Sequence, residues 1–157
     1  MNELAAVEIS TERARLDVEW IHASLRESYW ARGIPREVVD RSLANSMVFG
    51  AYEGARQIGV ARVITDHATF AYLADVFVDP AYRGRGVGVA LLQAIRAHPD
   101  LQDLRRWLLA TADAHGLYEK FGFSRVAEPG RWMEITSPNH YLHGLADEPS
   151  GGGRGRA

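Results

Sequence analysis

The segment between residues 83 and 88 combines glycine and arginine in a way that indicates anion binding. It reads Arg83-Gly84-Arg85-Gly86-Val87-Gly88 and follows an apolar, strand-like run and precedes a helical pattern. The first N–H groups of a helix have no partner within the helix, and the helix dipole makes that end positive. Such an end binds phosphate, glycines let the anion approach the backbone, and arginines add charge-assisted donors. We therefore expect the amides of residues 85–89 to face a phosphate group.

Two common phosphate-binding loops do not fit this segment. A Walker loop requires lysine and then serine or threonine after its second glycine, and neither follows here. A dinucleotide-binding fingerprint requires glycine at position 89, where this chain has Val89. A tight turn that only caps the following helix is the structural alternative.

Two motifs together resemble those of a known family. The run Val78-Asp79-Pro80-Ala81-Tyr82-Arg83-Gly84-Arg85-Gly86-Val87-Gly88 resembles the acetyl-CoA pyrophosphate loop of the GNAT N-acetyltransferase superfamily, whose pattern Arg/Gln-x-x-Gly-x-Gly/Ala is matched by Arg83, Gly86 and Gly88. The run Leu117-Tyr118-Glu119-Lys120-Phe121-Gly122-Phe123 is similar to the family's Leu-Tyr-x-Lys-x-Gly-Phe segment. The resemblance covers about residues 46–126.

The resemblance implies a set of residues that bind acetyl-CoA, the acyl donor. In the family, the strand before the loop separates from its neighbour at a bulge, and the pantetheine arm binds in the gap. Where the family often has asparagine, this chain has Thr111, whose hydroxyl is the corresponding candidate. The expected cofactor-binding residues are Val76, Phe77, Val78, Arg83, Gly84, Arg85, Gly86, Val87, Gly88, Val89, Thr111 and Ala114.

Tyr118 and Asp75 are the candidate catalytic residues. A phenol near the sulfur of the donor can protonate the leaving thiolate. Asp75 is the only charge inside an apolar strand, and burial of a carboxylate without a partner is costly. It is either a base or orienting group for the incoming amine, or a structural partner of an arginine or of the backbone. Asp66 and His115 are alternative bases.

Aromatic residues near the first expected helix indicate the acceptor site. Aromatic faces attract cationic amines, which favours an amine with an apolar or aromatic body. Trp20 and Tyr29 also fit the buried face of a helix, whereas Trp30 and Arg32 lie beyond its apolar repeat. The expected substrate-binding residues are Trp30, Arg32, Trp20 and Tyr29.

The elements that must position these residues alternate between strand and helix patterns. We expect helices to begin after Ser10 or Thr11, with an apolar face that extends to Tyr29, and again at residues 35–45, 86–98 and 116–121. We expect strands at residues 7–10, 46–52, 57–65, 69–78, 106–111, 123–126 and 131–135. This order predicts a mixed α/β (α+β) fold of the GNAT type. Its central, mostly antiparallel sheet is flanked by helices and has a V-shaped opening between two parallel strands.

Composition sets further limits. The chain has 157 residues, a formal net charge of −2 and no cysteine. The length predicts one domain, at residues 1–144, and the glycine-rich end of the chain predicts a flexible tail at residues 145–157. The net charge argues against nucleic-acid binding, and the absence of cysteine argues against thiolate chemistry. No metal site is expected, and no apolar run approaches the ~20 residues of a membrane helix. We expect a cytoplasmic enzyme, with a homodimer as one possibility.

The sequence therefore predicts an enzyme that transfers an acetyl group from acetyl-CoA to a primary amine of a small molecule. Two alternatives remain open at this point. One is a domain that binds acyl-CoA as a sensor or scaffold without catalysis. The other is an N-acetyltransferase whose acceptor is a protein or peptide.

Overall fold

A five-stranded sheet forms the centre of the molecule in the computed structural model, which describes residues 6–142. The strand order follows the sequence, and β4 and β5 are the only parallel pair among the described strands. The predicted mixed, mostly antiparallel sheet is thereby confirmed. The strands are β1 (Glu8–Ser10), β2 (Met47–Glu53), β3 (Arg56–Thr65), β4 (Phe70–Val78) and β5 (Arg106–Leu108).

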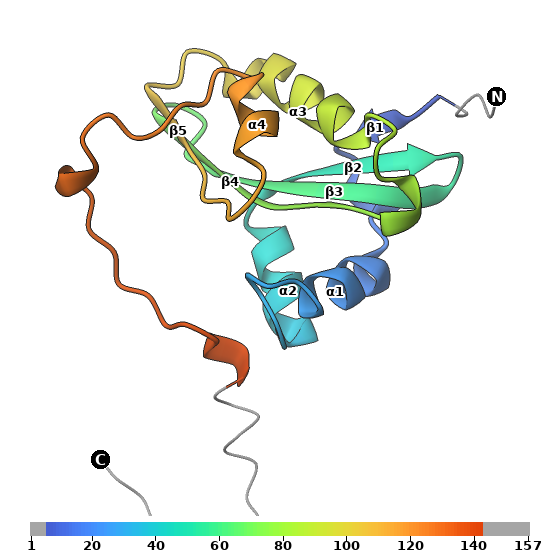
Figure 1. Ribbon diagram of the computed structural model, residues 1–157. Helices are drawn as coiled ribbons and strands as arrows, with labels where there is room; N and C mark the ends of the chain where they lie inside the picture. The colour runs from blue at the N-terminus through green and yellow to red at the C-terminus, as the bar shows by residue number, and fades with distance from the viewer. Residues whose placement is uncertain (1–5, 143–157) are drawn as a thin grey trace, which may run out of the picture.

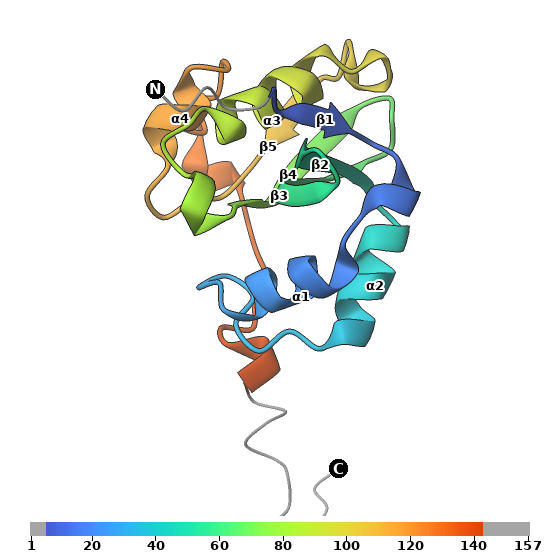
Figure 2. The ribbon, with the colours of Figure 1, turned by 90° about the vertical axis from the view of Figure 1, so that its right-hand side faces the viewer.

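Helices cover both faces of this sheet, as Figures 1 and 2 show. One face carries α1 and α2, and the opposite face carries α3 and α4. Because side chains alternate along a strand, neighbouring residues of β3 serve different layers: Val60 packs with α1 and α2, and Ala61 packs with α3. The helices are α1 (Val18–Arg26), α2 (Arg36–Ala44), α3 (Val87–Ala97) and α4 (His115–Glu119).

The first helix begins later than its capping residues predict. Ser10 and Thr11 are the expected caps, but a 3-10 turn at Arg13–Arg15 comes first, and α1 begins after Asp17. The Asp17 side chain accepts a hydrogen bond of 3.0 Å from the backbone N–H of Trp20. The prediction is wrong because an aspartate closer to the apolar repeat supplies the cap.

The V-shaped opening lies between β4 and β5. The ladder of these strands begins at Phe70–Arg106 and ends at Tyr72–Leu108, so Val76–Val78 have no paired residue on β5. On its other side, β4 has a register shift against β3 between the pairs Val60–Phe77 and Arg62–Ala74. Within this shift Asp75 has a φ of 52°, in the left-handed region, which marks a bulge. The predicted bulge and separation of the strands are both present.

The two last predicted strands are absent from the sheet. Residues 123–126 and 131–135 form no ladder with any strand that the structure describes. They are joined by a 3-10 turn at Pro129–Arg131, and the chain then runs away from the sheet, on the left of Figure 1. The prediction is wrong because an alternating pattern records an apolar face but does not bring the segment to the edge of the sheet, and here the chain leaves the free edge of β5 unpaired.

Some predictions lie at or beyond the limits of the described chain. The tail expected at residues 145–157 lies outside the described residues. Among residues 6–142, no helix has the length and apolar character to cross a bilayer. The same residues contain no cluster of three or more histidine, aspartate or glutamate side chains arranged to hold a metal ion.

Candidate active site

The glycine-arginine loop presents free amides at the start of α3. Gly84 and Gly86 have φ values of 75° and 82°, a region that favours glycine, and Gly86 is the N-cap of the helix. The first backbone bond into this turn runs from Ala90 N–H to the Gly86 carbonyl. Within the described chain, the N–H groups of residues 84–89 have no protein acceptor. The loop can therefore bind an anion without losing an internal hydrogen bond.

Asp79 fixes where this loop begins. Its backbone N–H continues the sheet by donating to the Ile58 carbonyl at 2.8 Å, and its side chain accepts from the N–H of Ala81 at 2.9 Å. Arg56 pairs with the second carboxylate oxygen at 3.3 Å. The Asp79-Pro80 step therefore ends β4 and turns the chain toward α3.

The two loop arginines lie over aromatic rings. The Arg83 guanidinium lies 5.3 Å from the centroid of Phe77 and donates from Nε to the Val78 carbonyl at 3.1 Å. The Arg85 guanidinium lies 5.5 Å from the centroid of Tyr82. Arg85 is exposed and has a long side chain, so it can reach a bound phosphate. Arg83 also donates to the Val78 carbonyl at the edge of the opening.

Tyr118 is buried on α4, just beyond the end of β5. Its side chain is 9% exposed, and its ring lies 6.0 Å from that of Phe123. Burial raises the pKa of the phenol above its ordinary value, and the nearby Tyr29 and Asp113 add to the shift. Tyr118 therefore stays protonated at neutral pH, as a proton donor must.

Asp75 is held by two donors from other elements. Its Oδ2 accepts from Arg62 Nε on β3 at 2.7 Å, and its Oδ1 accepts from the indole N–H of Trp30 at 2.8 Å. Arg62 also donates to the Ser46 hydroxyl at 3.1 Å. The arginine partner considered for Asp75 is present. A carboxylate has about four acceptor positions, so a further donor can still bind it.

Comparison with known proteins decides the family. The model of the acetyltransferase (GNAT) domain matches residues 44–125, which contain the loop, Asp75 and Tyr118. The chain belongs to the GNAT acetyltransferase family. An acetyltransferase-family protein of Gibberella zeae is 33% identical over 133 residues, which cover 71% of this chain and 75% of the relative.

Solved structures agree with this assignment. A GNAT-family protein from Xanthomonas campestris is 48% identical, with a TM-score of 0.86 over 88% of this chain and 99% of the other. An acetyltransferase from Clostridium acetobutylicum, solved with acetyl-CoA, shares the fold at 15% identity, with a TM-score of 0.62 over 83% of this chain and 96% of the other. The predicted GNAT fold and family are confirmed.

Two aromatic residues of the α1–α2 connection bridge the opening of this GNAT site. Trp30 bonds Asp75 on β4, and Tyr29 accepts a hydrogen bond of 3.1 Å from the N–H of Ala112, beyond β5. Their rings meet edge to face at 5.0 Å. Together with Arg32 and residues 136–141 they line a cavity of about 290 Å³. Three of the four expected acceptor residues therefore lie together.

Trp20 is the fourth, and it lies apart from that cavity. Its ring packs edge to face on Phe77 at 5.9 Å, within the apolar layer between α1 and the sheet. Helical spacing allowed Trp20 to be part of the buried face of the first helix, and the structure places it there. Its contact with β4 supports the strand that borders the opening.

The remaining candidates differ in how close they are to the site. Thr111 accepts a hydrogen bond of 3.1 Å from the N–H of Ala114 and so shapes the turn before α4.

Asp66 lies in the β3–β4 turn, at the opposite end of β4 from Val76–Val78. Hydrogen bonds from Thr69, Ala68 and Phe70 hold the pKa of the Asp66 carboxyl well below its usual range. Asp66 therefore anchors a turn and is not a base in this site.

Sequence reasoning missed Arg62. The signal was available, since Arg62 is the one charged residue inside an otherwise apolar strand pattern at residues 57–64, as Asp75 is in residues 70–78. Two single opposite charges on adjacent antiparallel strands predict an ion pair across them. The register pairs Arg62 with Ala74, and Asp75 is the next residue, in the bulge, so the ion pair could not be assigned from the strand pattern alone.

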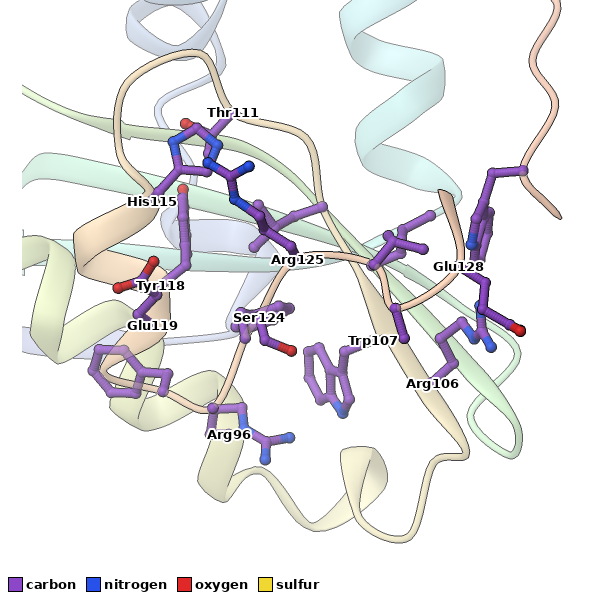
Figure 3. A pocket seen from close by; sticks show the side chains of 18 of the residues that line it. Arg96, Arg106, Trp107, Thr111, His115, Tyr118, Glu119, Ser124, Arg125 and Glu128 are labelled. Carbon is purple, nitrogen blue, oxygen red and sulfur yellow. The ribbon is translucent and has the colours of Figure 1, made fainter. Parts of the chain in front are cut away.

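A second cavity lies on the outer side of β5. It has a volume of about 740 Å³, and Figure 3 shows side chains from β5, α4 and the segment after α4 around it. Tyr118 and Thr111 line it, but no residue of the glycine-arginine loop or of Val76–Val78 does. The free amides of the glycine-arginine loop mark the phosphate end of the site. This cavity does not adjoin that loop, and it lies instead beside β5 and α4.

Proposed function

We propose that this GNAT acetyltransferase transfers the acetyl group of acetyl-CoA to a primary amine of a small molecule. The observation that carries the proposal is the row of unpaired amides at residues 84–89, next to the opening between β4 and β5. A helix start with two left-handed glycines fits a diphosphate. The acetyl-CoA present in the Clostridium acetobutylicum structure supports the same donor here.

Different segments of the chain bind different parts of acetyl-CoA. The amides at the start of α3 and the Arg85 guanidinium hold the diphosphate. The unpaired side of Val76–Val78 offers backbone groups to the pantetheine arm, and an amide there can hold the thioester oxygen. When bound, acetyl-CoA supplies the activated acetyl group.

Tyr118 then acts as the general acid. As the amine attacks, the leaving thiolate requires a proton, and the phenol of Tyr118 is buried and protonated beyond β5. The opposite proton transfer, from the incoming ammonium, falls to Asp75 or to water that Asp75 positions. The hydrogen bonds from Trp30 and Arg62 hold the Asp75 carboxylate in one orientation.

The acceptor is held by the aromatic bridge. Tyr29 and Trp30 are 57% and 42% exposed, which is high for aromatic residues in direct contact with each other. Their faces suit an amine with an apolar or aromatic body. Arg32 lies on the wall of the same cavity and suits an acceptor that also carries an anionic group.

The test has two parts. Calorimetry with coenzyme A measures whether the loop binds the donor, and a thiol-release assay with acetyl-CoA over a panel of amines measures transfer. Because the chain has no cysteine, a thiol reagent reports only the released coenzyme. We expect binding, and turnover with arylalkylamines above that with simple aliphatic amines.

Other results would redirect the proposal. Absence of binding at millimolar coenzyme A rejects it entirely. Binding without transfer to any amine favours a sensor of acyl-CoA. Transfer to lysine peptides but not to small amines favours a protein acceptor.

A further inference from the structure

The aromatic bridge, formed by Tyr29 and Trp30, joins the two sides of the opening between β4 and β5. Trp30 donates to Asp75, the bulge residue that directly precedes Val76–Val78 on β4. Tyr29 accepts from the N–H of Ala112, in the segment that follows β5. The bridge therefore crosses the opening at the level of the bulge, next to the stretch of β4 that has no paired residue on β5.

The backbone that carries the two rings is fixed by its neighbours. Ser28 and Ala31, on either side of the bridge, are each 7% exposed. The Ser28 hydroxyl donates to the Leu25 carbonyl at 2.6 Å and accepts from the N–H of Ala31 at 3.2 Å. Each ring has its own hydrogen bond to one side of the opening, and the two rings contact each other edge to face. The bridge is therefore a fixed wall and not a free loop.

The bridge and the phosphate-binding loop lie on opposite faces of the sheet. The loop leads into α3, which covers one face, whereas the α1–α2 connection lies with its helices on the other, as Figures 1 and 2 show. A donor whose diphosphate is bound at the start of α3, and whose arm passes between β4 and β5, must end on the α1–α2 side. Phe77 of β4 also lies on that side, where its ring packs against Trp20 of α1. The acyl end of the donor would thus meet aromatic rings.

We propose that the aromatic bridge closes the acyl end of the donor site and so selects acetyl-CoA over thioesters with longer acyl chains. This inference rests on the proposed function and adds to it the residues that choose the acyl group. An amide of Val76–Val78 that holds the thioester oxygen places the acyl group next to Asp75, and hence beside Trp30. Because the rings of Tyr29 and Trp30 are in contact, an acyl chain cannot pass between them.

Acyl length has opposite effects on affinity in an open and in a closed site. In an open apolar site, each further methylene removes more apolar surface from water and strengthens binding. In a closed site, the further methylenes must displace a ring, and with it the bond of Trp30 to Asp75 or of Tyr29 to Ala112. The order of the dissociation constants of acetyl-CoA and butyryl-CoA therefore distinguishes the two.

The acceptor role of the bridge predicts a different result. The same two rings line the cavity of about 290 Å³ that is proposed for the acceptor, and the amine and the acyl group must meet for transfer to occur. A bridge that contacted only the acceptor would leave donor affinity constant, or increasing, with acyl length. Measurements on the donor without any acceptor therefore isolate the role proposed here.

The test measures the dissociation constants of coenzyme A, acetyl-CoA and butyryl-CoA by calorimetry, with no amine present. In the parent, we expect butyryl-CoA to bind about tenfold or more weakly than acetyl-CoA. Trp30→Ala and Tyr29→Ala each remove half of the bridge and should abolish this difference. Trp132→Ala is the matched control, because Trp132 is exposed to a similar extent, 38% against 42% for Trp30, but lines the cavity beside β5. It should keep the preference of the parent.

Ratios to the affinity for coenzyme A itself separate the acyl group from the rest of the donor. Melting curves check that each variant is folded. A parent that binds butyryl-CoA as tightly as acetyl-CoA, or more tightly, overturns the inference and leaves the proposed function intact. A preference for acetyl-CoA that persists in both alanine variants of the bridge also overturns it, because another wall then selects the acyl group. Absence of coenzyme A binding in the parent rejects the proposed function and this inference with it.

Discussion

Trp30 and Asp75 are joined by a hydrogen bond of 2.8 Å from the indole N–H to Oδ1, across 45 residues of sequence. The bond connects the α1–α2 connection to the bulge of β4, where Asp75 has a left-handed φ of 52°. A non-glycine residue in that region costs about 1–3 kcal/mol and persists where its surroundings fix it. Trp30 and Arg62 supply those surroundings.

The Arg62–Asp75 pair should be strongly coupled. The two side chains are 16% and 10% exposed, so Arg62→Met leaves a mostly buried carboxylate with one donor. We expect the free energy of unfolding to fall by about 3 kcal/mol. In the double variant Arg62→Met/Asp75→Asn the loss should be smaller than the sum of the single losses, as urea unfolding can measure. Arg36→Met is the control, because its pair with Asp40 is exposed and should be worth less than about 1 kcal/mol. Additive losses at 62 and 75 would contradict the coupling.

Much of this fold follows from local patterns, and the exceptions have physical causes. The apolar runs at residues 47–53, 56–65 and 70–78 predict their strands because each is buried against a helix layer. The Gly86 cap and the end of β4 at Asp79-Pro80 are likewise set by single residues. The last two predicted strands are absent because the pattern at residues 131–135 records an apolar face but does not determine whether the segment reaches an edge of the sheet.

In the site, too, some features follow from local sequence and others depend on contacts between distant segments. The loop and Tyr118 are recognisable as short segments, since adjacent residues build them. The bonds from Trp30 and Arg62 to Asp75 depend on a bulge and on the path of a connecting loop, which shift positions by a residue or more. Contacts of that kind cannot be obtained from local spacing.

Tyr118→Phe should separate donor binding from turnover. We expect kcat to fall by roughly 10²–10⁴ with little change in the dissociation constant for coenzyme A. Because burial raises the pKa of Tyr118 above 10.0, the parent keeps its proton as pH rises to that value, and any loss of kcat from its ionisation begins only above it. Tyr72→Phe, on β4 far from the loop, is the matched control. Turnover that is unchanged in Tyr118→Phe would remove the acid role.

Gly86→Ala tests the backbone of the loop. The φ of 82° makes any Cβ unfavourable by about 1 kcal/mol, and the added methyl would lie where the diphosphate approaches. Calorimetry should show a dissociation constant for coenzyme A raised by about tenfold or more. Gly116→Ala in α4 is the control: no atom lies within 4 Å of its Cβ position, and alanine should stabilise the helix by about 1 kcal/mol. Equal coenzyme affinity in both variants would place the diphosphate elsewhere.

Tyr52→Phe should stabilise the protein, unlike most substitutions in a core. Tyr52 is 1% exposed, and its hydroxyl has no hydrogen-bond partner among the described residues, although the Arg15 guanidinium lies 4.2 Å from the ring centroid. Removal of a buried, unpaired hydroxyl should raise the free energy of unfolding by about 1 kcal/mol, which differential scanning calorimetry can detect.

The pH dependence of the free energy of unfolding provides a second test of Tyr52. Burial raises the pKa of Tyr52, so the folded protein keeps this proton at a pH where the unfolded chain loses it. The contribution of Tyr52 to stability is therefore retained below about pH 10 and lost as pH rises further, and Tyr52→Phe should show a shallower alkaline decline. Tyr82→Phe should behave oppositely near neutral pH, because the Tyr82 hydroxyl donates to Glu53 at 3.0 Å and its loss costs about 1 kcal/mol. A Tyr52→Phe protein that melts below the parent would show that its hydroxyl has a partner, such as a bound water.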